Sequence, residues 1–333
     1  MELQTNRLIL RPWQESDAEA LYKYARNPNV GPIAGWPPHT SIENSREIIK
    51  SVLSAPETYA VVLKETGEAV GSVGIMTARS EIHSAKIADD ECEIGYWIGE
   101  PYWGQGLIPE AVDELLRYAF KNLQKTVVWC GYFDGNEKSR RVQEKCGFTY
   151  SHTEQNKPVP LLNDFRTEHF TKLTLEEWKK QKGQMENIKK LFHRLSYLQY
   201  PLVLVAFVLL IKPLFKGFGY LSSNPEYLFN AYSNALIFFG VTLSFSALQD
   251  PTRTSLRFEK KIWQNPSKAK ALLSITLITT FIFFASGLLG FMMSGSSQRE
   301  FAFGSIVLAI GLLGYLKFQI EVFEIHKEKA SAK

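Results

Sequence analysis

The stretch from Gly95 to Ala111 reads Gly-Tyr-Trp-Ile-Gly-Glu-Pro-Tyr-Trp-Gly-Gln-Gly-Leu-Ile-Pro-Glu-Ala. It predicts a buried strand, a glycine-bearing turn and a helix with Pro109 at its first position, where a proline removes no intrahelical hydrogen bond. Gly104 and Gly106 allow a tight turn and the close approach of a bulky anion. A helix N-terminus gathers unpaired N–H groups at the positive end of the helix dipole. The segment therefore predicts a phosphate cradle made by the amides of Gln105, Gly106, Leu107 and Ile108.

This segment resembles the acetyl-CoA loop of the GCN5-related N-acetyltransferases (GNATs). Together with the sequence around it, it is most similar to the RimJ/RimL type, which acetylates α-amines of ribosomal proteins. The resemblance covers Leu3 to Trp178 and is carried, besides the loop, by Thr5–Trp13, Asp17–Leu21, Gly35–Ser41, Ala69–Gly74, Asn136–Val142, Lys145–Phe148 and Leu175–Trp178. Two residues depart from the family: Trp103 replaces the usual Gln or Arg, and Ile108 replaces a small residue. The resemblance implies the α+β GNAT fold, with a mixed, mostly antiparallel sheet flanked by helices.

The 333 residues fall into two unlike halves, which the mean hydropathy of −0.13 conceals. We expect a GNAT domain over 1–180, a basic juxtamembrane linker over 181–194, a membrane domain over 195–325 and a charged cytoplasmic tail over 326–333. The membrane domain holds four apolar runs, each with about the 20 residues that cross a hydrocarbon core of about 30 Å. These all-α transmembrane helices are predicted at about 195–215, 227–248, 271–294 and 301–320.

The positions of the basic residues predict how the chain is oriented. Lys189, Lys190 and Arg194 precede the first apolar run, and the 250–270 connection is rich in Lys and Arg, whereas the connections after the first and third runs carry little charge. The positive-inside rule then places the catalytic half and both termini in the cytoplasm of a bacterial cell, with the protein multi-pass in the inner membrane. The 250–270 connection can also attract anionic lipid; the simpler alternative is a topology signal alone.

Charge and cysteine content exclude other classes of partner. A net charge of +4 and a pI near 8.7 are too mild to indicate nucleic acid, and no recognition motif is present. Cys92, Cys130 and Cys146 show neither a CxxC pair nor metal-ligand spacing. We expect reduced cysteines that pack in the core, and no metal.

The resemblance supplies candidate catalytic residues. Glu93, in the strand beside the thioester, is expected to act as general base through water, and Glu91 on the same strand face is the alternative. Ser139, in the Asn-x-x-Ser motif, is expected to place its hydroxyl beside the CoA sulfur. Asn136 is expected to hold the pantetheine arm or the acceptor, or to cap the helix that carries Ser139. The remaining cofactor contacts are predicted at the backbone amides of Trp97 and Ile98, which would hold the thioester carbonyl, and at Arg140, which would reach the 3′-phosphate.

Fewer residues in the sequence indicate where the amine acceptor binds. Trp36 and His39 lie in a Trp-Pro-Pro-His segment that is expected to line a pocket, with His39 as an alternative base or a hydrogen-bonded loop residue. Arg166, with Glu168 and His169 on a late strand, is a further candidate for binding the acceptor.

These patterns predict a membrane-tethered, acetyl-CoA-dependent N-acetyltransferase of a primary amine, most simply a protein N-terminal α-amine. An α-amine with a pKa near 8 is about one-tenth neutral at pH 7, so it needs little help from a base. Two alternatives remain: a small or lipid-linked amine at the membrane, and a non-catalytic acetyl-CoA sensor that controls the membrane helices. The intact CoA loop and Ser139 favour catalysis.

Overall fold

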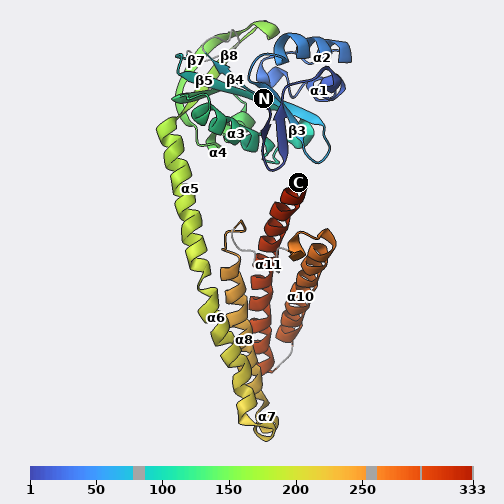
Figure 1. Ribbon diagram of the computed structural model, residues 1–333, viewed down its shortest axis with the longest axis vertical. Helices are drawn as coiled ribbons and strands as arrows, with labels where there is room; N and C mark the ends of the chain where they lie inside the picture. The colour runs from blue at the N-terminus through green and yellow to red at the C-terminus, as the bar shows by residue number, and fades with distance from the viewer. Residues whose placement is uncertain (78–86, 253–260, 293–294, 332–333) are drawn as a thin grey trace. The chain divides into compact units, whose positions relative to one another are not determined.

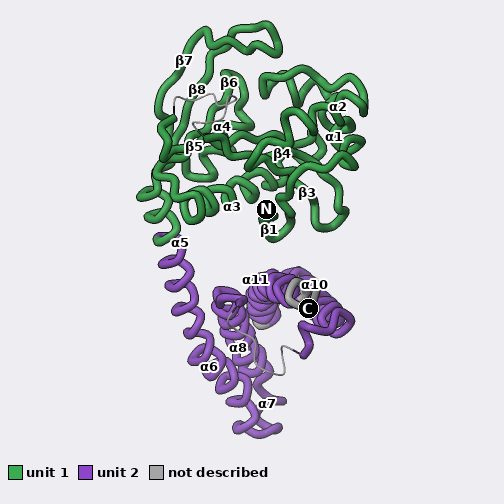
Figure 2. Tube along the Cα trace, turned by 45° about the horizontal axis from the view of Figure 1, so that its top comes forward, with its two compact units in different colours: residues 1–183 green, residues 184–333 purple. Residues whose placement is uncertain are grey.

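A computed structural model describes residues 1–77, 87–252, 261–292 and 295–331. The chain forms two compact units, Met1–Gly183 and Gln184–Lys333 (Figure 2). The boundary falls inside one helix, α5 (Leu175–Ser196), so the predicted juxtamembrane linker over 181–194 is helical.

The first unit is built on one eight-stranded sheet in the order β1-β2-β3-β4-β5-β6-β8-β7. Figure 1 shows this sheet with the helices around it. Its strands are β1 (Leu3–Gln4), β2 (Leu8–Arg11), β3 (Thr58–Leu63), β4 (Ala69–Thr77), β5 (Glu91–Ile98), β6 (Val127–Phe133), β7 (Thr149–Val159) and β8 (Asp164–Thr174). Every described pair of neighbours is antiparallel except β5 and β6. The mixed, mostly antiparallel sheet predicted from the sequence is confirmed.

Helices flank this sheet on both faces. Besides α5 they are α1 (Ala18–Ala25), α2 (Ile42–Ile48), α3 (Leu107–Lys121) and α4 (Glu137–Lys145). Shorter turns of helix lie at Glu15–Asp17, Pro32–Ala34, Ile49–Leu53, Glu100–Tyr102 and Pro160–Leu162. The two faces are set by the period-two alternation of strand side chains. In β3, Val61 belongs to the core over α3, whereas Ala60 and Val62 belong to a second core with α1.

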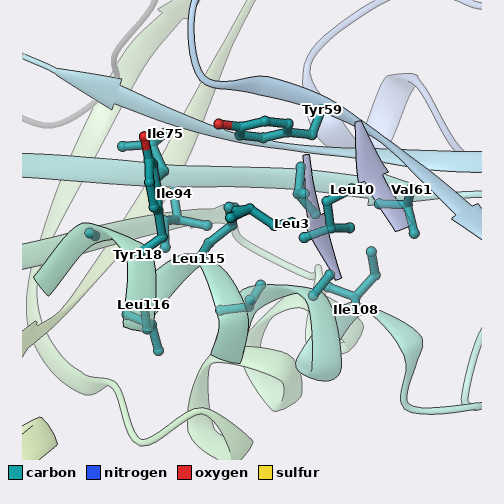
Figure 3. Close-up of a cluster of buried hydrophobic side chains, with 14 of the residues drawn as sticks. Leu3, Leu10, Tyr59, Val61, Ile75, Ile94, Ile108, Leu115, Leu116 and Tyr118 are labelled. Atoms are coloured by element: carbon teal, nitrogen blue, oxygen red, sulfur yellow. The ribbon is translucent and has the colours of Figure 1, made fainter. Parts of the chain in front are cut away.

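The larger core lies between the sheet and α3 (Figure 3). Ile108 and Leu115 of α3, two turns apart, point to the strands, where they belong to one core with Ile94 of β5 and Leu10 of β2. Leu115 and Leu116 are fully buried. Burial of a leucine side chain stabilises a fold by about 1.5–3 kcal/mol, so this face fixes α3, and with it the loop at the helix N-terminus, against β5.

β5 and β6 pair in parallel over a short length only. The described register runs from Glu91 opposite Val127 to Glu93 opposite Trp129. Beyond this point β5 continues to Ile98 in register with β4 on its other side. The Ile94 carbonyl still accepts from Cys130 Sγ of β6 at 3.2 Å, and from Gly95 onward the backbone of β5 has one edge that β6 does not cover.

The second unit is helical. It contains α6 (Gln199–Ile211), α7 (Phe218–Ser223), α8 (Pro225–Ser246), α10 (Pro266–Met292) and α11 (Ser296–Ser331), with a short turn of helix at Lys212–Lys216. In the part of the chain that the structure describes, four helical stretches are long and apolar enough to cross a bilayer: Leu175–Lys216, Pro225–Ser246, Pro266–Met292 and Gln298–His326. The fold class predicted for this half, four apolar helices, is confirmed. α11 runs as one helix through the predicted tail to Ser331.

Small residues set the packing of α8 on α11. A side chain at Gly240 would meet the backbone of Val307, one at Gly311 would meet the backbone of Gly240, and one at Gly304 would meet Ser233. Close backbone approach of this kind is how apolar helices associate where lipid leaves no hydrophobic driving force. Large apolar side chains such as Phe281 and Leu289 face outward instead.

The basic 250–270 connection is only partly described. Arg253, Arg257 and Lys260 lie outside the described residues, whereas Lys268 and Lys270 begin α10. The predicted attraction to anionic lipid stays a prediction.

Candidate active site

A cavity of about 490 Å³ opens beside the uncovered edge of β5. It lies between the end of β5, the loop before α3 and the first turns of α4. Its lining residues are Asn29, Val30, Ile33, Ala34, Tyr96, Trp97, Ile98, Tyr102, Trp103, Gly104, Gly106, Leu107, Ile108, Pro109, Asn136, Lys138, Ser139, Arg141, Val142 and Lys145. The predicted phosphate loop and the predicted Asn-x-x-Ser motif therefore border the same cavity.

The loop takes the shape that its glycines allow. Gly104 and Gly106 have φ values of 76° and 75°, in the left-handed region that favours glycine. Gly106 is the N-cap of α3, which begins at Leu107. The sequence predicted Pro109 as the first residue of the helix, whereas it is the third. It still lies in the first turn, where a missing N–H breaks no intrahelical bond.

An ion pair anchors this loop to the start of the chain. Glu110 accepts hydrogen bonds from Thr5 Oγ1 (2.5 Å), the backbone N–H of Arg7 (2.8 Å) and Arg7 Nε (2.7 Å). Arg7 also donates to the carbonyl of Gln105 at 3.0 Å. Burial alone would raise the pKa of Glu110, but the hydrogen bonds from Thr5 and Arg7 outweigh it and lower the pKa below its ordinary 4.5.

The strand register decides which amides of β5 face the cavity. The N–H of Gly99 donates to the carbonyl of Val70 in β4 at 2.8 Å. Because the bonding direction alternates along an antiparallel pair, the amide of Trp97 also faces β4. The amides of Tyr96 and Ile98 therefore face the uncovered edge and the cavity.

Asn136 and Ser139 are arranged by the start of α4. Asn136 is the N-cap, and its Oδ1 accepts from the backbone N–H of Ser139 at 3.1 Å. The cap fixes the first turn, so that the Ser139 side chain is presented to the cavity. Ser139 Oγ lies 3.0 Å from Tyr96 Oη and accepts from Gln143 Nε2 at 3.2 Å.

Glu93 and Glu91 lie on the sheet face opposite Cys92 and Ile94, which belong to the α3 core. Glu93 is only 3% exposed and does not line the cavity. Glu91, the alternative base, accepts a hydrogen bond from Trp129 Nε1 at 2.8 Å, which holds its carboxylate at the start of the strand.

Trp36 and His39, predicted to bind the acceptor, lie over the face of the sheet that carries Glu93. The Trp36 ring lies 5.6 Å from that of Trp97, while His39 is buried with Nδ1 2.8 Å from Ser45 Oγ. Burial lowers the pKa of His39. Neither residue lines the cavity at Ser139. Trp36 and His39 thus pack between the β5 surface and α2.

Arg166 donates to the carbonyl of Pro32 at 2.6 Å and lines a second cavity of about 500 Å³ with Glu100, Trp103 and Lys138. This cavity adjoins the first: both are bordered by Trp103 and by Lys138, whose Nζ lies 3.3 Å from the centre of the Trp103 ring. On the late strand, Glu168 is 5% exposed and ion-paired with a lysine of β7, Lys157, at 2.9 Å.

Arg140 does not reach the cavity. It pairs with Glu137 at 2.6 Å and Glu144 at 3.1 Å on the outer side of α4. The adjacent Arg141 lines the cavity instead, together with Lys138 and Lys145. The spacing of Lys138, Arg141 and Lys145, at i, i+3 and i+7, marks one helix face, and this periodicity in the sequence could have identified them.

Two further residues that the sequence analysis did not single out reach Ser139. Gln143 follows Ser139 by four residues in α4, so the helical period brings it to the Ser139 hydroxyl. Tyr96 belongs to β5, and only the packing of α4 on the sheet brings it there.

The three cysteines belong to the first unit, and Cys92 and Cys130 are buried there. Cys92, Cys130 and Cys146 are free thiols, and burial raises the pKa of Cys92 to about 12. Within the described ranges, no three His, Cys, Asp or Glu side chains come together as a group that could hold a metal ion.

Known proteins resemble the first unit. The family described as acetyltransferase (GNAT) domain matches residues 7–149. An uncharacterized N-acetyltransferase, p20, of Bacillus licheniformis is 31% identical over 126 residues, which are 36% of this chain and 67% of that protein. An Aspergillus fumigatus protein named FsC-acetyl coenzyme A-N(2)-transacetylase is 28% identical over 183 residues, 53% of this chain and 77% of that protein.

Among solved structures, the ribosomal-protein-S5-alanine acetyltransferase of Vibrio fischeri is 20% identical, with a TM-score of 0.43 over 54% of this chain and 98% of that chain. Proteins named as ribosomal-protein acetyltransferases are among those to which this chain is similar. The chain belongs to the GNAT family of acetyl-CoA-dependent N-acetyltransferases.

Proposed function

We propose that this chain transfers the acetyl group of acetyl-CoA to a protein N-terminal α-amine, from a catalytic unit held at the cytoplasmic face of the inner membrane. The observation that carries the proposal is the shared cavity. The N-terminus of α3, the uncovered edge of β5 and the Ser139 hydroxyl all border it. The helix N-terminus can bind a phosphate, the strand edge a thioester carbonyl, and the hydroxyl a thiolate.

The phosphates of CoA are assigned to the loop and to α4. The pyrophosphate would accept hydrogen bonds from the amides of Gln105–Ile108, where the helix dipole favours negative charge. Lys138, Arg141 and Lys145 line the same cavity and offer three positive charges to the remaining phosphate. Arg140 is already paired with two glutamates and is not assigned this role.

The gap between β5 and β6 is the place assigned to the thioester. Since the two strands pair only as far as Glu93 and Trp129, an acetyl group in this gap is open to both faces of the sheet. Its carbonyl oxygen would accept from the Ile98 amide, and its sulfur would lie on the α4 face near Ser139. The acceptor amine would approach from the opposite face, where Glu93 lies.

In this arrangement the neutral amine attacks the carbonyl carbon and passes a proton, through water, to the Glu93 carboxylate. The carbon–sulfur bond then breaks, and CoA leaves as a thiolate that accepts a hydrogen bond from Ser139. A thiol with a pKa near 8.5 needs little more than such a donor. An α-amine with a pKa near 8 is about one-tenth neutral at pH 7, against well under one part in a thousand for lysine at 10.4. An α-amine therefore needs less help from a base than a lysine side chain does.

The membrane tether is supported by the four apolar helical stretches and by the charge bias of their connections. A protein inserted in this way presents its catalytic unit to cytosolic acetyl-CoA. The basic 250–270 connection is proposed to lie at the anionic headgroups of that leaflet.

The test uses the full chain in phospholipid nanodiscs and two matched peptides. One peptide has a free α-amine and no lysine; the other has a blocked N-terminus and one lysine. We expect acetylation of the first, and a loss of about 10²–10⁴-fold in kcat for Glu93→Gln, as is typical on removal of a general base. Full activity in the Glu93→Gln/Ser139→Ala double variant would refute the site, and binding of acetyl-CoA without turnover of any amine would favour a sensor.

The acceptor class is tested in cells. N-terminal acetylation is compared with and without the gene, in soluble and membrane fractions separately. Acetylated protein N-termini that disappear with the gene support the proposal. Loss of acetylation confined to membrane lipid or small amines would replace it by the lipid-linked or small-amine alternative.

A further inference from the structure

The hydroxyl of Ser139 is held by two other side chains. Gln143 Nε2 lies 3.0 Å from the carbonyl of Gly131 and 3.2 Å from Ser139 Oγ. A carbonyl can only accept, so the amide nitrogen of Gln143 must face Gly131, and its second N–H is then directed at Ser139 Oγ. Thr171 Oγ1 lies 2.8 Å from Gln143 Oε1 and 3.2 Å from the Cys130 carbonyl, and donation of its one proton to the nearer Oε1 agrees with this orientation of the amide. Gln143 is 1% exposed, so this donor is rigid.

Tyr96 is the second partner. Its hydroxyl lies 3.0 Å from Ser139 Oγ and 3.1 Å from the Ser139 carbonyl, so its single proton can be given to either oxygen. Burial raises the pKa of Tyr96 well above 10, and the phenol keeps its proton throughout the pH range of the reaction.

A serine hydroxyl has two lone pairs and one proton. When Gln143 and Tyr96 both donate to Ser139 Oγ, its lone pairs are occupied, and its proton can be donated only into the cavity. We propose that Tyr96 and Gln143 are positioning residues that direct the Ser139 proton at the sulfur of acetyl-CoA. This inference rests on the role proposed above for Ser139 as donor to the departing thiolate.

The positioning role of Tyr96 and Gln143 follows from the negative charge that develops on the CoA sulfur during the reaction. In the ground state the thioester sulfur is a weak acceptor, and Ser139 can instead donate to Tyr96 Oη. As the carbon–sulfur bond breaks, both bonding electrons go to sulfur, and the proton of the amine goes to Glu93. The new thiolate draws the Ser139 proton, while the Tyr96 proton moves from the Ser139 carbonyl to Ser139 Oγ. No proton leaves Ser139 or Tyr96. Because Gln143 and Tyr96 hold the Ser139 oxygen in place, only two hydroxyl hydrogens turn as the charge develops, and little reorganisation is needed. Each donor to Ser139 Oγ also makes the Ser139 proton a better donor.

The experiment is a double-mutant cycle on the full chain in nanodiscs, with Tyr96→Phe and Ser139→Ala. A single hydrogen bond of this strength corresponds to about a tenfold loss of kcat. We expect Tyr96→Phe to lower kcat about tenfold, with KM for acetyl-CoA unchanged, and to have no further effect in the Ser139→Ala background. The matched control is Tyr59→Phe, which removes a buried hydroxyl from the same sheet at Glu57 and should leave kcat unchanged.

A second readout separates a positioning role from a loss of packing. An acetyl thioester of an aryl thiol, whose thiolate is much less basic, needs less help to leave, so the loss in Tyr96→Phe should shrink towards none with this donor. An equal loss with both donors, or a tenfold loss that persists in the Ser139→Ala background, would overturn the inference. Full activity of Ser139→Ala would instead overturn the proposed function, so the two failures are distinguishable.

Discussion

The assignment of the CoA phosphates can be tested on two adjacent arginines. Arg141 lines the cavity, and Arg140 points to Glu137 and Glu144. Charge-assisted hydrogen bonds contribute about 1.5–3 kcal/mol. Arg141 is exposed, so solvent screening favours the lower end, about 1.5 kcal/mol, which corresponds to about a tenfold change.

We therefore expect Arg141→Ala to raise KM for acetyl-CoA, and Kd for CoA measured by calorimetry, about tenfold. The reacting carbon is not contacted by this side chain, so kcat should stay constant, as for a loss of uniform binding. Arg140→Ala removes the same charge from the same helix and should change KM less than about twofold, because exposed ion pairs contribute little.

Two further measurements sharpen the assignment. Raised salt should weaken binding of CoA more in the wild type than in Arg141→Ala, since one screened contact is already absent. With acetyl-CoA that lacks the 3′-phosphate, the effect of Arg141→Ala should disappear if that phosphate is its ligand. A tenfold rise in KM for Arg140→Ala, with Arg141→Ala unchanged, would refute the reasoning from the cavity and restore the original prediction.

The remaining predictions concern backbone, charge and packing. Gly106→Ala places a side chain at a φ of 75° and should destabilise the first unit by about 1–2 kcal/mol, seen in tryptophan-fluorescence melting, whereas Gly183→Ala in the helical α5 should stabilise it by about 0.5–1 kcal/mol. The lowered pKa of Glu110 adds stability above pH 4.5 that is lost as the pH falls through its folded value, so Glu110→Gln should flatten the acid limb of a pH–melting curve; an unchanged limb would contradict this. Gly311→Val should separate α8 from α11 and make the helical unit sensitive to trypsin in mild detergent. Cys92 should react with maleimide at neutral pH only after unfolding, because burial raises the pKa of its thiol to about 12.

Local chemistry explains what could be predicted at the cofactor site. The strand, turn and helix around Gly106 follow from glycine φ preferences and helix-end hydrogen bonding, which act within a few residues. The same holds for Asn136 and Ser139, because an N-cap and the third residue after it are joined by one turn of helix. Length and apolar composition alone identify helices that can cross a bilayer. The spacing of Lys138, Arg141 and Lys145 on one helix face is also readable from the sequence.

The sequence by itself determined the family, the phosphate loop and the four apolar helices, because each depends on residues that are near neighbours along the chain. Tertiary structure alone decided which amides of β5 face the cavity, since that depends on the register with β4 and on where β6 stops pairing. It also decided that Tyr96 meets Ser139, 43 residues away, and that Gly240 meets Gly311. These contacts form only when helices pack on a sheet or on each other. Such packing is set by the summed burial of many apolar side chains, and no short motif encodes it.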